Sequence, residues 1–251
     1  MATPPITRAM LLAAGRGARL KPLTDITPKP LVPVGGRPMV AYVIDLLTAC
    51  GIREMHVNSH HLSERILAEL GDGTGWGLDV VHHPETVMLG SGGGLANAIR
   101  ESPELADGAF VMVNSDVLTD VDLGRVIAHH QQSGAIATLM LRPDPAADQY
   151  GILATDEAGA IRRILDHDLG GSVRELMFTG IQIIDPRLLA YHPEGRDAFS
   201  IIGTYVNALH AGESLSAYIH DGYWNDLGTP ERLLQAEHDL AEGRVGGAVA
   251  P

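Results

Sequence analysis

The feature that most constrains the fold is an alternation of short apolar runs with helical segments in the first half of the chain. Expected strands cover residues 8–14, 54–59, 79–82 and 110–114. Expected helices cover residues 39–49, 62–70, 91–100 and 123–132. The runs are short and end at glycine or polar residues, which is typical of buried parallel strands. The alternation predicts a doubly wound α/β fold.

The second half is less regular and predicts a mixed, mostly parallel sheet. Further strands are expected at residues 135–141, 150–154, 160–165, 178–184 and 215–220. The pair 150–154 and 160–165 flanks a turn at 156–159 and predicts a hairpin. Helices are expected over 201–211 and from Thr229-Pro230-Glu231 onward, with a Gly- and Ala-rich frayed tail at 242–251. No six-residue repeat is present, so we expect one domain, with halves at about 1–120 and 121–241, and no β-helix domain.

Charge and cysteine content restrict the partners. Lys and Arg total 18 against 31 Asp and Glu, a net charge of −13, which disfavours nucleic acid as the main partner. A few cations in one cleft can still hold a small phosphate ligand. Cys50 is the single cysteine, which excludes a disulfide framework within one chain and favours the cytoplasm. With no apolar leader and no run long enough for a bilayer, we expect no membrane association and leave a homo-oligomer open.

A glycine loop follows the first expected strand. Gly15 and Gly17 are spaced by one residue, but Leu20 stands where a dinucleotide fingerprint has its third glycine, and no G-K-[ST] follows. Taken alone, this loop could equally be a tight turn. Arg19 and Lys29, the latter fixed between two prolines, add two cations to the turn of backbone N–H groups. Together these groups predict a cradle for a triphosphate.

The run from Leu12 to Met39, LAAGRGARLKPLTDITPKPLVPVGGRPM, resembles the signature of sugar-1-phosphate nucleotidylyltransferases. That signature joins G-x-G-[ST]-R to P-K-P-[LM] at this distance, and Ala18 departs from its usual Ser or Thr. The resemblance implies a Rossmann-like, GT-A-like nucleotidyltransferase fold. It places the nucleotide against Leu12, Ala13, Ala14, Gly15, Arg16, Gly17, Ala18, Arg19 and Lys29. Arg19 is then expected at the pyrophosphate portion, and Lys29 at the oxygens around the reacting phosphorus.

Two acids complete the catalytic set that the resemblance implies. Asp116 follows the strand at 110–114, and Asp226 lies in YWNDLGTPE, which resembles the family's late motif W-x-D-[IVL]-G-T-P-E. In the family both acids hold Mg²⁺, an ion that takes oxygen ligands and bridges phosphates. The two acids are more than one hundred positions apart and have to meet in the fold. Without the resemblance, Asp116 could be a loop or helix-capping residue, and Asp226 could be a turn residue before the last helix.

Base and sugar contacts are also implied by resemblance. The segment ETVMLGSGGG resembles the element beside the base, which gives Glu85, Gly90 and Ser91 to the nucleotide; the alternative is a loop in which Ser91 caps a helix. On the sugar side the expected residues are Tyr150, Gly151, Thr179 and Gly180. Thr179 would offer its hydroxyl and Gly180 would leave room for the ring. Phe178 departs from the usual Asn.

The implied reaction transfers a nucleotidyl group from GTP or UTP to a sugar 1-phosphate, with Mg²⁺ as cofactor. The nucleophile is already an anion, so no general base is required. Compact relatives act on N-acetylmuramate, mannose or heptose 1-phosphate and supply peptidoglycan or cell-surface polysaccharide precursors. Two alternatives stay open: a cytidylyltransferase for phosphocholine or another alcohol phosphate, and a non-catalytic regulatory nucleotide-binding module. The adjacent histidine pairs at 60–61, 82–83 and 129–130 are interpreted as surface residues.

Overall fold

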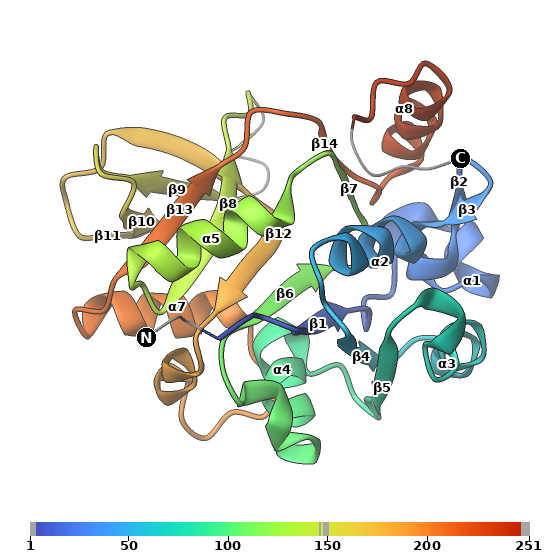
Figure 1. The fold of residues 1–251 in the computed structure, drawn as a ribbon, viewed down its shortest axis with the longest axis horizontal. Coiled ribbons are helices and arrows are strands. Elements are labelled where there is room, and N and C mark those ends of the chain that lie inside the picture. Colours follow the sequence, from blue (N-terminus) through green and yellow to red (C-terminus); the bar gives the residue numbers. More distant parts are fainter. Residues whose placement is uncertain (1–3, 146, 148–150, 247–251) are drawn as a thin grey trace.

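The computed structural model describes residues 4–145, 147 and 151–246. Its first half forms four parallel strands: β1 (Arg8–Leu12), β4 (Glu54–Ser59), β5 (Asp79–Pro84) and β6 (Phe110–Asn114). They lie in the order β6-β1-β4-β5, as expected for a doubly wound fold (Figure 1). The carboxyl ends of these strands therefore meet along one edge, where ligands of such sheets bind.

The second half extends the sheet with mainly antiparallel partners. Its strands are β8 (Ala137–Arg142), β9 (Ile152–Thr155), β10 (Ile161–Ile164), β11 (His167–Asp168), β12 (Arg174–Ile184) and β13 (Leu215–Ile219). β12 runs antiparallel to β6 and connects the two halves, while β13 lies parallel to β8. The mixed sheet is confirmed, and so is the hairpin, in which β9 and β10 flank the Asp156–Gly159 turn.

Helices cover both faces of the sheet. One face carries α2 (Met39–Ala49), α3 (Ser63–Leu70) and α5 (Leu123–Ser133), and the other carries α4 (Gly90–Glu101) and α7 (Ile201–His210). β1 shows how the sequence produces two cores, because Leu11 packs toward α2 while its neighbour Met10 packs toward α4. Each fully buried side chain of this size contributes about 1.5–3 kcal/mol.

A third apolar cluster anchors the loop after β1. This loop contains η1 (Ala18–Leu20), α1 (Leu23–Ile26), η2 (Lys29–Leu31), β2 (Pro33–Val34) and β3 (Arg37–Pro38). Leu20 packs with Leu227 and with Ala236 of the last helix, α8 (Pro230–Ala241). The Thr229 side chain accepts the Arg232 amide and caps α8, as its sequence predicts. The remaining short turns are η3 (Thr74–Trp76), η4 (Pro103–Ala106) and η5 (Pro186–Tyr191).

A small antiparallel pair joins distant parts of the chain. β7 (Val117–Thr119) pairs with β14 (Trp224–Asp226), with Asp226 opposite Val117. The sequence does not predict these strands because three residues are too short to show a period. Their pairing brings the segment after Asp116 beside the segment that carries Asp226.

Several sequence-based expectations need correction. β1 ends at Leu12 rather than residue 14. Ser91 does not cap α4: the helix begins one residue earlier, and the Ser91 hydroxyl accepts the amide of Ile201. Residues 242–246 are not frayed, because Val245 is buried in the third cluster and Arg244 pairs with Asp239 at 2.9 Å.

Two of the histidines interpreted as surface residues are buried. His83 shares hydrogen bonds with Glu101 at 2.7 Å and with His56 at 2.9 Å, and His130 bonds Thr138 at 3.0 Å. Among the helices in the described part of the chain, none combines the length and the apolar character needed to cross a bilayer.

Candidate functional site

A pocket of about 250 Å³ lies at the carboxyl ends of β1, β4 and β6. Most of the residues expected to contact a nucleotide line it: Leu12, Ala13, Ala14, Gly15, Lys29, Gly90 and Ser91. Asp116 lines the same pocket. The signature loop, the start of α4 and the first acid are therefore brought together at the edge where a doubly wound sheet binds ligands.

Gly17 determines how the loop returns to the strand end. Its φ of +64° lies in the left-handed region, and a Cβ there would lie 2.7 Å from the Thr24 side chain and 3.1 Å from Cβ of Lys29. The Thr24 hydroxyl also donates to the Gly17 carbonyl at 2.8 Å. The absence of a side chain at Gly17 thus lets the loop fold closely over Thr24 and carry Lys29 back to the pocket.

The rest of the loop lies outside the pocket. Arg16, Gly17 and Ala18 do not line it, and Arg16 and Ala18 are exposed. The Arg19 side chain is 59% exposed, and its Nη2 lies 3.7 Å from Oδ2 of Asp226. Arg19 therefore reaches the second acid rather than the pocket wall.

Asp116 and Asp226 meet as the resemblance implies. Asp116 follows β6, Asp226 ends β14, and the amide of Leu227 donates to the Asp116 carbonyl at 2.9 Å. Lys29 Nζ forms an ion pair with Oδ2 of Asp116. Four charged groups from the beginning, the middle and the end of the chain are thus collected in one place.

The environment of Asp226 disfavours its charge. Burial raises the pKa of the Asp226 carboxyl, and the nearby Asp116 charge raises it further, while Lys29 and Arg19 act in the opposite direction. Oδ1 of Asp226 is buried and has no hydrogen-bond partner among the residues that the structure describes. A Cβ at Gly228 would lie 2.5 Å from this oxygen, so the glycine keeps space beside it. A buried carboxylate oxygen without a donor is energetically costly, and it is therefore a feature that the function of the site has to explain.

These donors fit Mg²⁺. Both acids offer oxygen, the ligand that this ion prefers, and Mg²⁺ is commonly held by one or two carboxylates together with substrate phosphates. Among the described residues no group of three or more His, Cys, Asp or Glu side chains gathers as a complete cage. A site with two protein ligands leaves coordination positions for phosphate oxygens and water.

Glu85 is placed differently from the expectation that it contacts a base. It does not line the pocket, and both of its oxygens accept hydrogen bonds inside the protein, from Asn58 Nδ2 at 2.7 Å and from the Leu89 amide at 3.0 Å. Asn58 does line the pocket. The sequence signal for Asn58 is a polar residue near the carboxyl end of a buried parallel strand, a position that the family resemblance does not single out.

The sugar-side expectations also change. The Thr179 hydroxyl is buried and donates to the Met140 carbonyl at 2.7 Å, so it is not offered to a ligand. Gly180 has φ +84°, and a Cβ there would lie 2.5 Å from Nδ2 of Asn114, so this glycine makes room for Asn114, which lines the pocket. Gly151 similarly accommodates Leu165, whose side chain would lie 2.7 Å from a Cβ at that position. Tyr150 lies outside the described residues.

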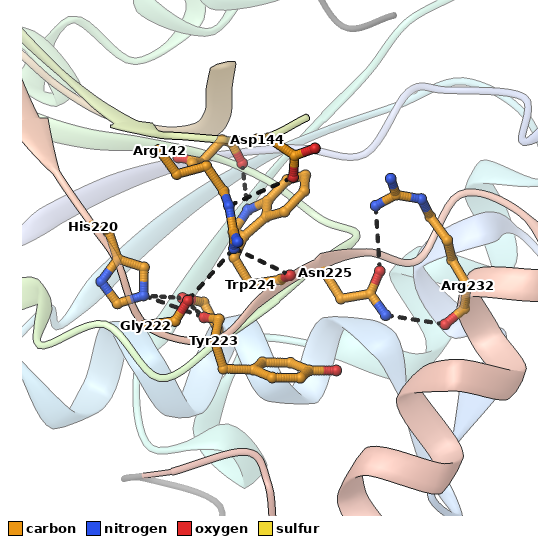
Figure 2. Close-up of polar contacts among 10 residues, drawn as sticks. Arg142, Asp144, His220, Gly222, Tyr223, Trp224, Asn225 and Arg232 are labelled. Carbon is orange, nitrogen blue, oxygen red and sulfur yellow. Dashed lines mark hydrogen bonds and ion pairs between the residues drawn. The ribbon is translucent and has the colours of Figure 1, made fainter. Parts of the chain in front are cut away.

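Figure 2 shows the polar contacts that hold β14. The guanidinium groups of Arg142 and Arg232 lie 5.7 and 5.9 Å from the ring centroid of Trp224, and Arg142 donates to the Trp224 carbonyl at 3.5 Å. The indole of Trp224 donates to the Thr179 carbonyl at 3.0 Å. Asn225 donates to the Arg232 carbonyl at 3.1 Å and so links β14 to α8. These contacts fix the strand that positions Asp226.

Comparison with known proteins agrees with this geometry. Residues 8–243 match the family model described as nucleotidyl transferase. The chain is 32% identical to the N-acetylmuramate alpha-1-phosphate uridylyltransferase of Neisseria meningitidis, over 92% of this chain and 96% of that protein. It is 31% identical to the UTP–glucose-1-phosphate uridylyltransferase of Synechocystis sp. and 30% identical to the mannose-1-phosphate guanylyltransferase of Mycobacterium tuberculosis. The alignments with these two cover 97% and 94% of this chain but only 66% and 65% of the relatives.

Solved structures show the same fold. A Bacillus anthracis structure provisionally named as a glucose-1-phosphate thymidylyltransferase superposes with a TM-score of 0.80, at 22% identity and 97% coverage of each chain. HddC from Yersinia pseudotuberculosis superposes with a TM-score of 0.75, at 21% identity, over 94% of this chain and all of that one. The signature loop, the two acids that meet beside it and the match over residues 8–243 together show that this chain belongs to the nucleotidyl transferase family.

Proposed function

We propose that this chain transfers a nucleotidyl group from a nucleoside triphosphate, GTP or UTP, to a sugar 1-phosphate and releases pyrophosphate. The observation that carries the proposal is the meeting of Lys29, Asp116 and Asp226 beside a pocket built from the signature loop. Such a group of one cation and two acids suits phosphoryl chemistry, in which positioning and charge neutralisation supply most of the catalysis.

Different residues of the site contact different parts of the triphosphate in this proposal. Backbone from Leu12 to Gly15 forms the wall of the pocket, and Gly15 has open space where a Cβ would stand, so phosphate oxygens can approach its backbone closely. Lys29 faces the reacting phosphate, and the exposed Arg19 is free to turn toward the pyrophosphate portion. An oxygen of the sugar phosphate forms a bond to the α-phosphorus while the bond to the bridging oxygen breaks and pyrophosphate leaves in line.

Asp116 and Asp226 are the proposed Mg²⁺ ligands. When bound between these two acids, the ion would neutralise phosphate charge and act as a Lewis acid. The partnerless buried oxygen of Asp226 supports this assignment. Lys29 forms an ion pair with Asp116, so this lysine is positioned to exchange an acid partner for a phosphate partner.

The relative from Neisseria meningitidis supports N-acetylmuramate 1-phosphate and UTP as the first pair to test, because this chain covers 96% of that protein. The mannose-1-phosphate guanylyltransferase from Mycobacterium tuberculosis supports GTP with mannose 1-phosphate as the second pair. The product would supply peptidoglycan or cell-surface polysaccharide synthesis from the cytoplasm. The net charge of −13 supports small-molecule partners over nucleic acid.

Pyrophosphate release from a matrix of substrates tests the proposal. GTP, UTP, CTP, ATP and dTTP are each combined with Mg²⁺ and with several sugar 1-phosphates or phosphocholine. Turnover with a sugar 1-phosphate that disappears in Asp116→Asn supports the proposal. Preferred use of phosphocholine would assign the chain to the cytidylyltransferases for alcohol phosphates, and background release from every pair would make it a nucleotide-binding regulatory module.

A further inference from the structure

A chain of three hydrogen bonds, two of them buried and the third partly buried, connects the signature loop to the start of α4. The amide of Ala13 donates to Oδ1 of Asn58 at 2.9 Å, Nδ2 of Asn58 donates to Oε1 of Glu85 at 2.7 Å, and the amide of Leu89 donates to Oε2 of Glu85 at 3.0 Å. Asn58 is 2% exposed and Glu85 is 7% exposed. The chain thus runs between two walls of the nucleotide pocket through the ends of β4 and β5.

The order of donors and acceptors permits one arrangement. If the Asn58 amide were turned over, its NH₂ group would face the Ala13 N–H and its oxygen would face the Glu85 carboxylate, so both bonds would be lost. Ionised Glu85 accepts from both sides and has no proton to donate. The Ala13 donor on one side and the Glu85 acceptor on the other therefore fix the orientation of the Asn58 amide.

The surrounding backbone holds this pair closely. The Glu85 amide donates to the Ser59 carbonyl at 2.7 Å, and the Glu85 carbonyl is bonded by Nδ1 of His60 at 2.9 Å. On the side of α4, a Cβ at Gly94 would lie 2.5 Å from Nδ2 of Asn58 and 2.7 Å from Oε1 of Glu85. The helix therefore needs a glycine at this point to pack against the pair.

From this geometry we infer that Asn58 and Glu85 are positioning residues for the nucleotide. They set the separation between the Ala13 backbone and Leu89, whose neighbour Gly90 lines the pocket together with Ala13. The inference deepens the proposed function and rests on it for the identity of the ligand. Glu85 acts through its hydrogen bonds with Asn58 and Leu89.

Two near-isosteric substitutions break the hydrogen-bond chain at different places. In Asn58→Asp a second carboxylate faces Glu85 and no donor remains between them. In Glu85→Gln the new amide has a single acceptor oxygen, although the N–H groups of Asn58 and Leu89 each need an acceptor. Either the Asn58 or the Leu89 N–H group therefore faces the NH₂ group of the new amide. In the double variant, the carboxylate introduced at position 58 would accept from Ala13 and from the amide introduced at position 85. The oxygen of that amide would accept from Leu89, so all three bonds return with the charge on the other residue.

The experiment measures nucleotide affinity for the wild type, both single variants and the double variant. Binding is measured with Mg²⁺ and each nucleoside triphosphate without sugar phosphate, so it does not depend on turnover. KM for both substrates and kcat are measured where turnover is found. Each single variant is expected to weaken nucleotide binding at least tenfold, with KM for the sugar phosphate within about twofold, and the double variant to return to within about threefold of the wild type. Coupling of this kind is the signature of a pair that acts as a unit.

Three outcomes would overturn the inference. The first is unchanged nucleotide binding in both single variants. The second is a double variant impaired by the product of the single effects. The third is a changed base preference in Glu85→Gln that Asn58→Asp does not correct, which would show direct contact of Glu85 with the base. If the single variants fail to fold, the nucleotide affinity of the double variant still tests the inference, because the double variant keeps every hydrogen bond. Rescued binding without turnover from any substrate pair would instead reject the proposed reaction and keep the inference.

Discussion

The amide of Leu227 donates a 2.9 Å hydrogen bond to the carbonyl oxygen of Asp116. This bond continues the β7–β14 pair by one step and joins the loop after β6 to the residue after Asp226. The two carboxylates are consequently positioned by backbone hydrogen bonds, which tolerate side-chain substitution. Variants of the acids are therefore expected to keep the fold and to report on chemistry.

Asp226→Asn should separate stability from activity. Burial and the charge of Asp116 raise the pKa of Asp226, so its ionised form destabilises the folded state at neutral pH. Removing the charge is expected to leave the melting temperature in EDTA unchanged or higher. Turnover should fall by about 10²–10³-fold, the usual effect of losing one electrostatic contact to a transition state. A variant with lower stability and retained turnover would contradict the assignment.

Lys29→Met should cost both stability and turnover. Lys29 and Asp116 are only 14% and 15% exposed, so loss of the cation leaves a poorly solvated carboxylate beside Asp226. We expect a loss of about 1–3 kcal/mol in the free energy of unfolding, measured in urea without Mg²⁺. The double variant Lys29→Met with Asp116→Asn is the matched control and should recover the stability but no turnover. Failure to recover stability would show that Lys29 contributes through other contacts.

Gly17→Ala and Gly15→Ala form a matched pair. Alanine at Gly17 is strained by φ +64° and meets Thr24 at 2.7 Å, so a loss of about 1–3 kcal/mol is expected in urea unfolding. A Cβ at Gly15 would have no heavy atom within 4 Å, so Gly15→Ala should fold normally. If phosphate approaches this backbone, Gly15→Ala should nevertheless raise KM for the nucleotide. Equal stability of the two variants would contradict the role given to Thr24.

Acid should destabilise the folded protein through buried histidines. Burial lowers the pKa of His56, His130 and His192 below 6.5, so the folded state binds fewer protons than the unfolded state just below that pH. Stability should therefore fall as the pH falls through about 6.5, by at most about 1.4 kcal/mol per pH unit for each group. Urea unfolding at several pH values in EDTA measures the slope.

His192→Phe tests the contribution of one of these residues. Within the described part of the chain, Nε2 of His192 is buried without a hydrogen-bond partner. The His192 ring lies 5.1 Å from that of Phe199, so an aromatic replacement fits the site. The variant should be at least as stable as the wild type at pH 7.5 and lose less stability on acidification. An unchanged dependence of stability on pH would show that His192 does not contribute to the destabilisation by acid.

The sequence predicts the strands well where burial on both faces leaves a continuous apolar run. β6 occupies Phe110–Asn114, the range expected for it, because four of its five residues face packed helices. The signature loop and the two acids are identified by resemblance, and the structure brings Asp116 and Asp226 together. β7 and β14 escape prediction because their pairing depends on a partner more than one hundred positions away.

The direction of individual side chains is the least predictable property. The resemblance places Thr179 and Gly180 at a sugar, yet Thr179 bonds Met140 across the sheet and Gly180 makes room for Asn114. The Thr179 bond depends on the register between β12 and β8, where Phe178 lies opposite Leu141. The Gly180 contact depends on the register between β12 and β6, where Ile181 lies opposite Val113. A one-residue change in either register would turn the β12 side chains to the opposite face of the sheet. No local sequence pattern specifies these registers.

The pairing of β7 with β14 also determines the stage of protein synthesis at which the proposed site is complete. The loop, Lys29 and Asp116 leave the ribosome long before Asp226, and the strand that carries Asp226 docks only after most of the chain has been made. A product truncated by proteolysis or early termination before Trp224 would lack the second acid and also Leu227 and α8, which anchor the signature loop through Leu20. Such a fragment is expected to lose nucleotide binding together with turnover, so the late strand couples both proposed properties to completed synthesis.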